Sequence, residues 1–310
     1  MVAIPPDWLP EGRTAAVVWS IDDVHPATSE DAYEAGGDLE RGALGHVLWL
    51  LERQPQLQVT LFTTPDWREI SPFPTRAIRS RIPVVRDRTY LAPILPKGTM
   101  ALDRHPDFVR FLDGMPRTEI ALHGLHHVHR GPSIPVEFQD EGRRTLRAKL
   151  AEAVAIFERA GVRWSPGMQP PGWNLTEALE AASRDVGLSW VASARDINTA
   201  VAPDALTAMS GRSKMSLIYP QRLPSGLVHF TSNFQATSPI ERAHEIIEHG
   251  GLLAIKAHIV KAAMGHIALD GVDRLYMNYL DRVVSELQQT YGDRIWWTTM
   301  GSIAARLGER

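Results

Sequence analysis

Residues 15–23 read AAVVWSIDD, an apolar run that ends in the adjacent carboxylates Asp22 and Asp23. A short run of this kind is typical of a buried strand. Runs of the same type recur at 58–63, 119–122, 162–165, 188–193, 227–232, 252–257 and 294–298. Helical stretches lie between them, at 39–53, 139–160, 174–186, 239–249 and 275–291. This alternation predicts βαβ units and a largely parallel sheet.

The composition of the 310-residue chain excludes several classes of protein. It has no cysteine, so it is neither a disulfide scaffold nor a thiolate enzyme. Its 33 Lys and Arg against 36 Asp and Glu give a net charge of −3, with both signs scattered, so we expect no nucleic-acid partner. Neither a membrane span of ~18 apolar residues nor a secretory signal is visible. We therefore expect a cytoplasmic protein in which histidines and carboxylates hold any metal.

Residues 64–118 interrupt the alternation. They hold eight prolines and show little periodicity, which predicts either a long ordered insertion or a mobile lid. No repeat or linker divides the rest of the chain, so we expect one domain over residues 1–310, with 64–118 as an insertion.

Polar residues follow five of the predicted strands. Ligands in parallel α/β sheets bind at the carboxyl ends of the strands, because the loops there converge. The residues at these ends are Asp22 with Asp23, His123 with His126 and His127, Gln169 to Trp173, Arg195 with Asp196, and His258.

Four of the twelve histidines lie in HGLHHVH, residues 123–129. His123 and His127 are four residues apart, and on a helical turn that spacing places two imidazoles within reach of one ion of the zinc class. His126 could replace either one, and His129 lies outside the pattern. The alternative is a solvated histidine-rich loop.

The two aspartates and His258 suggest acid–base chemistry. Neighbouring side chains of an extended strand point in opposite directions, so one of Asp22 and Asp23 can face a metal and the other a water or substrate. The alternative is a helix N-cap with a solvated neighbour. His25 could line the same rim. His258 could act as an acid at neutral pH, although a single histidine after a strand is more often structural.

Four motifs occur in order: SIDD at 20–23, H-x-x-x-H at 123–127, QPPGW at 169–173 and L-x-I-x-x-H at 253–258. Together they resemble the polysaccharide deacetylase (NodB homology) family, carbohydrate esterase family four, over about residues 14–305. The resemblance implies a distorted (β/α)7 barrel that removes acetyl groups from N-acetylated sugars. It also implies one divalent metal, with zinc expected first and cobalt, manganese or nickel as alternatives.

The resemblance assigns a role to each matching residue. The implied metal ligands are Asp23, His123 and His127. Asp22 becomes the general base and His258 the general acid, and Asp196 is the carboxylate expected to tune His258. The implied substrate-binding residues are Gln169, Pro171, Gly172, Trp173 and His25.

One position departs from the family pattern. The family normally has arginine where this chain has Gln169, and that arginine pairs with the catalytic aspartate. Glutamine donates a hydrogen bond but carries no charge. Either a neighbour such as Arg195 supplies the charge, or the substrate and mechanism differ.

The predicted activity is hydrolysis of the acyl–nitrogen bond of an N-acylated amino sugar, such as a small, nucleotide-linked or lipid-linked sugar. One alternative is hydrolysis of another small non-peptide amide or of a cyclic ureide with the same ligands. A second alternative is a catalytically inactive carbohydrate-binding relative, which Gln169 and tryptophans near strand ends favour.

Overall fold

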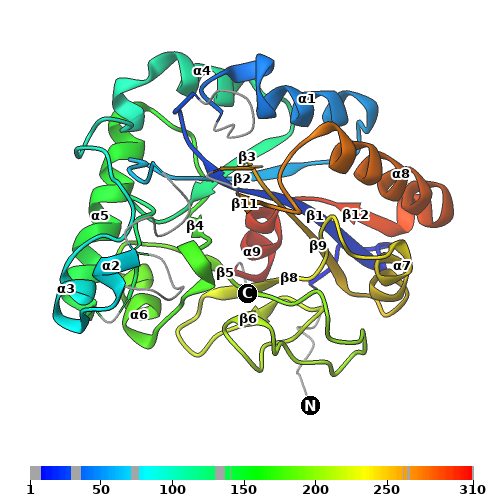
Figure 1. Cartoon of the computed structure of the whole chain (residues 1–310). Helices are drawn as coiled ribbons and strands as arrows, with labels where there is room; N and C mark the ends of the chain where they lie inside the picture. Colours follow the sequence, from blue (N-terminus) through cyan, green and yellow to red (C-terminus); the bar gives the residue numbers. More distant parts are fainter. Residues whose placement is uncertain are drawn as a thin grey trace.

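A mostly parallel sheet lies at the centre of the molecule, and helices surround it (Figure 1). The computed structural model describes residues 8–28, 36–70, 77–129, 137–139, 141–260, 262–263 and 266–308. The parallel strands are β1 (Ala15–Val24), β2 (Val59–Thr63), β3 (Thr118–Leu122), β4 (Gly167–Met168), β5 (Trp190–Arg195), β8 (Val228–Ser232), β9 (Leu252–His258) and β12 (Ile295–Trp297).

The first strand, β1, has three parallel neighbours in the sheet. It pairs in parallel with β2, with β9 and, through its first residues, with β12. From β2 the order continues through β3, β4, β5 and β8, and the chain just after β8 meets β9 at the bridge between Phe234 and Ile255. The predicted parallel α/β class is confirmed. The complete barrel stays a prediction, because an isolated bridge is what links β8 to β9.

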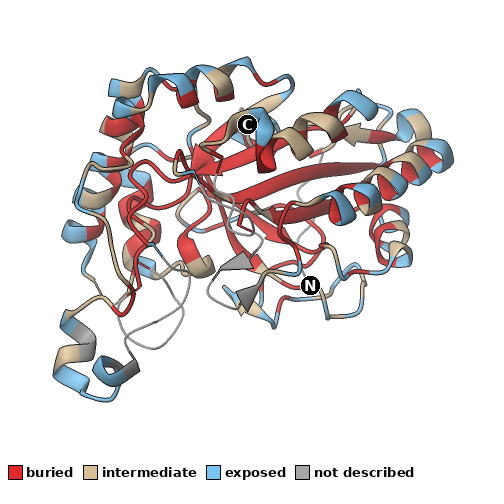
Figure 2. Ribbon diagram, turned by 45° about the horizontal axis from the view of Figure 1, so that its top comes forward, coloured by how far each residue is buried: buried red, intermediate tan, exposed pale blue. Residues whose placement is uncertain are grey.

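Amphipathic helices cover this sheet. In α8 the buried residues Tyr276, Leu280, Val283 and Leu287 recur at three- and four-residue steps, which is the spacing of one helical face. Figure 2 shows the same division, with buried inner faces and exposed outer faces. The principal helices are α1 (Ala43–Arg53), α4 (Pro106–Gly114), α5 (Arg143–Ala160), α6 (Glu177–Asp185), α7 (Ile240–Glu248), α8 (Arg274–Tyr291) and α9 (Met300–Gly308).

Shorter elements complete the described chain. The short strands are β6 (Ser210–Gly211), β7 (Gln221–Arg222), β10 (Ala262–Ala263) and β11 (His266–Ile267). The short helices are η1 (Leu39–Arg41), α2 (Ala77–Ser80), α3 (Pro83–Arg88), η2 (Leu102–Arg104), η3 (Pro171–Trp173) and η4 (Gly292–Arg294).

The fourth strand differs from its predicted position. A strand was expected at 162–165, but the backbone N–H of Val162 closes the end of α5 by donating to the carbonyl of Phe157. Gly161, with φ 71°, allows this turn. The strand forms later, as Gly167–Met168. The prediction was wrong because the apolar residues after Gly161 belong to the cap of the helix.

The proline-rich stretch 64–118 is part of the fold at both ends. Its first residues include Asp66, Trp67 and Glu69, all buried. Its last part forms α4, which buries Phe108 and Leu112. Between them lie α2 and α3, with residues 71–76 outside the described part of the chain. A lid is therefore a prediction for the middle of this stretch alone.

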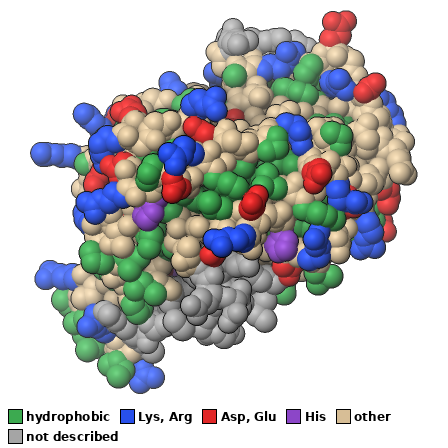
Figure 3. Space-filling view, turned by 90° about the horizontal axis from the view of Figure 1, so that it is seen from above, with side chains coloured by type: hydrophobic (Ala, Val, Ile, Leu, Met, Phe, Trp, Pro, Cys, Tyr) green, Lys and Arg blue, Asp and Glu red, His purple; other side chains and the backbone are tan. Residues whose placement is uncertain are grey.

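The described surface agrees with the scattered charges of the sequence. Figure 3 shows basic and acidic side chains interspersed over the face that it presents. Among the described helices, none combines the length and apolarity that crossing a membrane requires.

Packing of β4 against β5 gives a testable prediction. A Cβ at Gly167 would overlap the ring of Trp190, which is fully buried and packs edge-on against Phe62 and Phe230. Gly167→Ala should lower the free energy of unfolding by about 1–3 kcal/mol, because the core cannot absorb the added atom. Urea unfolding measures this change. Gly114→Ala is the control, since no atom lies within 4 Å of its added Cβ; equal stability of the two variants would contradict the prediction.

Candidate metal and catalytic site

An irregularity at the end of β1 turns two adjacent carboxylates toward one place. The pairing of β1 with β2 changes register between Ile21 and Val24, and Asp23 has φ 65°. Asp22 Oδ2 and Asp23 Oδ2 lie 3.8 Å and 4.0 Å from Nε2 of His258. A bulge of this kind re-aims a side chain. The bulge therefore sets the directions of these two side chains. The simple strand alternation expected from the sequence does not set them.

The two histidines expected to bind metal converge on Asp23. Asp23 Oδ1 lies 3.0 Å from Nε2 of His123 and 3.0 Å from Nε2 of His127. One potential ligand atom from each residue lies within 4.8 Å of the others. The three residues could therefore hold a metal ion.

The histidine segment is an irregular loop and not the expected helical turn. Gly124 has φ 69° and His127 has φ 49°. The Glu137 carboxylate accepts from the backbone N–H groups of Leu125, His126 and His127 at 3.0, 2.9 and 3.1 Å. A Cβ at Gly124 would collide with this carboxylate. Glu137 thus organises the loop, and no local pattern in the sequence identified it.

Neighbouring groups orient both candidate ligands. Nδ1 of His123 lies 2.9 Å from the carbonyl oxygen of Gln169, so Nδ1–H donates there and Nε2 is left with a lone pair toward Asp23. Nδ1 of His127 lies 3.7 Å from Oε2 of Glu69. The Trp67 ring stacks on His127, with centroids 4.6 Å apart. Each imidazole is therefore held from the side away from Asp23.

Charge is strongly coupled within this cluster. Burial opposes protonation of His127, but Asp23 and Glu69 outweigh burial and raise its pKa to about 10. Burial also opposes ionisation of Asp23, but the charge and the hydrogen bond of His127 hold the pKa of Asp23 well below the usual range. The cluster therefore favours a cation between the carboxylate and the imidazoles.

The other histidines of the segment have different partners. Nδ1 of His126 lies 3.1 Å from the carbonyl oxygen of Asp66 and 3.2 Å from its carboxylate. Nδ1 of His129 lies 2.7 Å from Oε1 of Glu69. Of the alternatives left open by spacing, the structure thus selects His123 and His127 for the Asp23 cluster.

His25 is a neutral donor beside the cluster. Its ring also stacks on Trp67, with centroids 4.0 Å apart. Burial lowers its pKa to about 3, and its Nδ1 accepts from the backbone N–H of Ala27 at 3.3 Å. The proton of the neutral ring therefore sits on Nε2.

The register between β9 and β1 sets His258 opposite Asp22. Nδ1 of His258 lies 3.0 Å from Oδ1 of Asp270. Burial opposes protonation of His258, but Asp270 outweighs it and raises the pKa of the imidazole. The same pairing holds the pKa of Asp270 well below its usual range against the effect of burial. His258 is therefore equipped to give a proton near neutral pH.

Asp196 does not occupy the place expected for it. Its carboxylate accepts from the backbone N–H groups of Asn198, Thr199 and Ala208 and from the Thr199 hydroxyl, at 2.8–3.1 Å. These bonds order the loop after β5. Asp270 stands against His258 instead, so the expectation for Asp196 is corrected. A single carboxylate in a segment without periodicity offered no sequence signal.

Gln169 contacts Asp22, as the motif predicts. Its Nε2 donates to Asp22 Oδ2. Arg195 does not supply the charge that Gln169 lacks, because its guanidinium donates to Oε1 of Gln235 at 2.6 and 3.1 Å. The ammonium of Lys256 lies closer, with Nζ 3.6 Å from Asp22 Oδ2.

The turn η3 forms one wall of the site. Gly172 and Trp173 have φ 66° and 58°. The Trp173 ring lies edge-on to His258, with centroids 6.4 Å apart, and 4.9 Å from Nζ of Lys256. Pro171 packs beside Gly124, whose added Cβ would touch the proline ring. This arrangement places Trp173 beside His258 and Pro171 beside the histidine loop.

Several buried polar atoms around this place have no hydrogen-bond partner among the described residues. They include Asp22 Oδ1, His25 Nε2, Gln169 Oε1 and Trp173 Nε1. An unpaired buried polar atom costs about 1–3 kcal/mol. Two acceptors and two donors gathered in this way are suited to a polar ligand.

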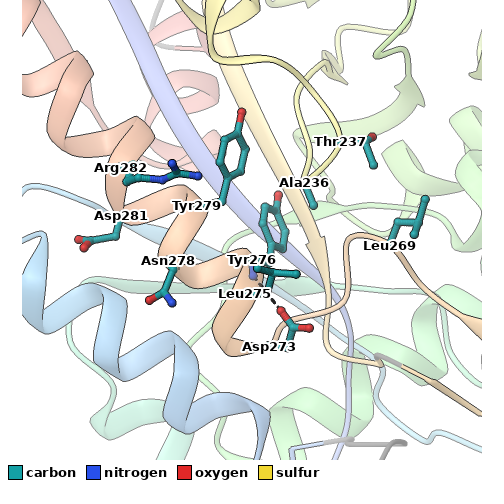
Figure 4. Close-up of a pocket in the computed structure, with 10 residues that line it drawn as sticks. All are labelled: Ala236, Thr237, Leu269, Asp273, Leu275, Tyr276, Asn278, Tyr279, Asp281 and Arg282. Carbon is teal, nitrogen blue, oxygen red and sulfur yellow. Dashed lines mark hydrogen bonds between the residues drawn. The ribbon is translucent and has the colours of Figure 1, made fainter.

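A separate cavity of about 630 Å³ lies beside α8 (Figure 4). Tyr276, Tyr279 and Arg282 of α8 line it, together with Ala236 and Thr237 from the segment between β8 and α7. Its lining includes none of the site residues predicted from the sequence. The candidate site is therefore identified by its chemistry and not by this cavity.

Comparison with known proteins supports the fold. No protein-family model matches the chain, and no curated protein matches it. A candidate polysaccharide deacetylase from Mycobacterium smegmatis superposes with a TM-score of 0.57 and 16% identity, covering 99% of this chain and 94% of the other. The Puue allantoinase does so with a TM-score of 0.57 and 14% identity, covering 99% and 93%. The chain therefore shares the fold of these two proteins.

Proposed function

We propose that this chain is a metal-dependent hydrolase that removes an acetyl or other small acyl group from the nitrogen of a small amino sugar. One observation carries the proposal. Nε2 of His258, a potential acid, lies 3.8 Å from Oδ2 of Asp22, a potential base, and 4.0 Å from Oδ2 of Asp23, which in turn joins His123 and His127. This arrangement contains the groups that amide hydrolysis needs.

The residues present fit a divalent metal. Asp23, His123 and His127 offer one carboxylate oxygen and two imidazole nitrogens, and three protein ligands with an open position are typical of catalytic zinc. Their 3.0 Å separations are near the ~3.3 Å that bonds of about 2.0 Å give in a tetrahedral site. A bound ion would supply Lewis acidity to the acyl carbonyl. Zinc is proposed, with cobalt, manganese and nickel as alternatives.

The protein residues would handle the protons. Oδ1 of Asp22 is unpaired while Gln169 holds Oδ2, so Oδ1 can take a proton from the water that attacks the carbonyl carbon. The carbon–nitrogen bond then breaks, and Nε2 of His258 gives its proton to the departing nitrogen while Asp270 holds Nδ1. The products are a carboxylate and a free amine.

Hydrolysis of a cyclic ureide is the second candidate. Gln169 turns a carbonyl acceptor, Oε1, away from Asp22 and leaves it buried and unpaired, and a ring N–H would satisfy it. The similarity to an allantoinase equals that to the deacetylase in TM-score. The same acid, base and ligands would serve this reaction.

A substrate panel separates these possibilities. With zinc or cobalt added, the protein should release acetate from at least one N-acetylated small or nucleotide-linked sugar; ring opening of a ureide without acetate release would favour the second candidate.

Asp22→Asn should lower turnover by about 100-fold or more, the usual range for a lost acid–base group, and should retain one metal per chain by elemental analysis. Stoichiometric sugar binding with no product from any substrate would instead indicate an inactive carbohydrate-binding protein.

Metal binding should release protons. His127, with a pKa of about 10, is protonated at pH 7 and must lose that proton before Nε2 can bind an ion. We expect about one proton released per zinc at pH 7, and an affinity that rises about tenfold per pH unit between pH 6 and 8. Calorimetric titrations in buffers of different ionisation enthalpy measure this release. A binding heat that is independent of the buffer would contradict it.

Glu137→Gln should weaken metal binding without unfolding the protein. The amide keeps one acceptor but turns an NH₂ group toward backbone donors that the carboxylate now binds, so the loop carrying His127 loosens. We expect a 10- to 100-fold loss of zinc affinity, the usual effect of disturbing the support of a ligand. Competition with a chromogenic chelator measures the dissociation constant. Glu158→Gln, on the exposed side of α5, should leave it unchanged.

A further inference from the structure

A buried lysine lies between two carboxylates. One is Asp22, the proposed base, and the other is Asp270, which contacts the proposed acid, His258. Lys256 is in β9, two residues before His258, so both side chains lie on one face of the strand. Its side chain is 1% exposed. Nζ lies 2.8 Å from Oδ2 of Asp270 and 3.6 Å from Oδ2 of Asp22.

The remaining contacts close the ammonium in. The ring centroid of Trp173 lies 4.9 Å from Nζ, a cation–π distance. Nδ1 of His258 lies 3.0 Å from Nζ, but its proton is directed to Asp270 Oδ1. Nε2 of the same ring also lies 3.1 Å from Nζ, so the ammonium contacts the His258 imidazole as well as the two carboxylates. A buried ammonium is stable only when charges of opposite sign surround it.

Asp22 needs this charge. Its side chain is 2% exposed, and Gln169 gives it a neutral hydrogen bond. Arg195 is engaged with Gln235. Besides His258, whose Nε2 lies 3.8 Å from Asp22 Oδ2, Lys256 is thus a cation beside this buried carboxylate, whose motif neighbour is uncharged.

We propose that Lys256 is a positioning residue that joins the base to the acid. Its ammonium bridges Asp22 and Asp270, and Asp270 in turn holds His258, so the separation between Asp22 and His258 is set through one lysine. Lys256 acts through these groups and does not touch the substrate. The inference rests on the proposed hydrolase function for its catalytic consequence, while the charge pairing itself does not.

Kinetics of Lys256→Met test the proposal. This variant keeps the apolar stem and removes the charge. We expect kcat to fall about 100-fold, the loss that follows from misplacing a catalytic group by about 1 Å, with KM and zinc content within about threefold of the unmodified protein. Lys97→Met, at an exposed position, is the control and should change neither. A Lys256→Met enzyme with kcat within threefold of the unmodified protein overturns the proposal.

Moving the charge across the site provides the second test. Because Gln169 already donates to Asp22, an arginine there would direct its guanidinium at the same carboxylate. Gln169→Arg combined with Lys256→Met should recover kcat at least tenfold over Lys256→Met alone. If the added arginine brings no recovery, Lys256 does not act through its charge on Asp22, and the inference fails.

Thermal stability separates this inference from the proposed function. If the charge of Lys256 balances that of Asp22, Lys256→Met should lower the melting temperature. The double variant Lys256→Met/Asp22→Asn should regain part of that decrease, because it no longer buries an unbalanced carboxylate. Should Lys256→Met not fold, folding of the double variant supports the pairing. Additive shifts, or a double variant that also stays unfolded, refute it. These readouts hold even if no substrate is hydrolysed, an outcome that would remove the hydrolase proposal alone.

Discussion

The parallel register between β1 and β9 is the constraint on which the candidate site depends. It sets Asp22 opposite His258 and Ser20 opposite Lys256, so the base, the acid and the lysine between them meet where two central strands lie side by side. A slip of one residue would turn each of these side chains to the other face of its strand. The register is held by the buried residues of both strands, Ala15–Ile21 of β1 and Leu252–Ala257 of β9. Packing of apolar residues thus positions the polar ones.

Strand ends were the part of this site that sequence could predict. An apolar run and the polar residue after it are adjacent in the chain, so Asp22, Asp23, His123 and His258 could be identified from local pattern together with the rule that such ends converge. Glu137 and Asp270 act on the same site from irregular segments, through bonds to the histidine loop and to His258. No local periodicity marks such residues. Asp196 shows the converse, since a carboxylate after a strand was expected at the site and instead ties down its own loop.

Backbone strain and unpaired atoms gather at the same place. Asp23, His127 and Trp173 all have positive φ without being glycine, and conformations of this kind cost of order 1–3 kcal/mol each. The unpaired atoms of Asp22, His25 and Gln169 add to that cost. A chain that only needed to fold would relax these features, because ordinary strand ends and turns are available. They persist where surrounding packing enforces them, which is the usual signature of a site that a ligand completes.

Charge balance links the metal, the lysine and the protons. The carboxylates of Asp22, Glu69 and Asp270 are buried around the site and that of Asp23 is half-buried, and Lys256 is paired with two of the four. Without further cations the carboxylates are in excess, which is the physical reason that the pKa values of His127 and His258 are raised. A divalent ion at Asp23 would take over the role of the proton on His127, but it would leave Asp270 with His258 and Lys256. Metal and proton thus compete at Asp23, His123 and His127. The proton of the acid, His258, is held by a different carboxylate, that of Asp270. This separation allows one site to bind a cation and still deliver a proton.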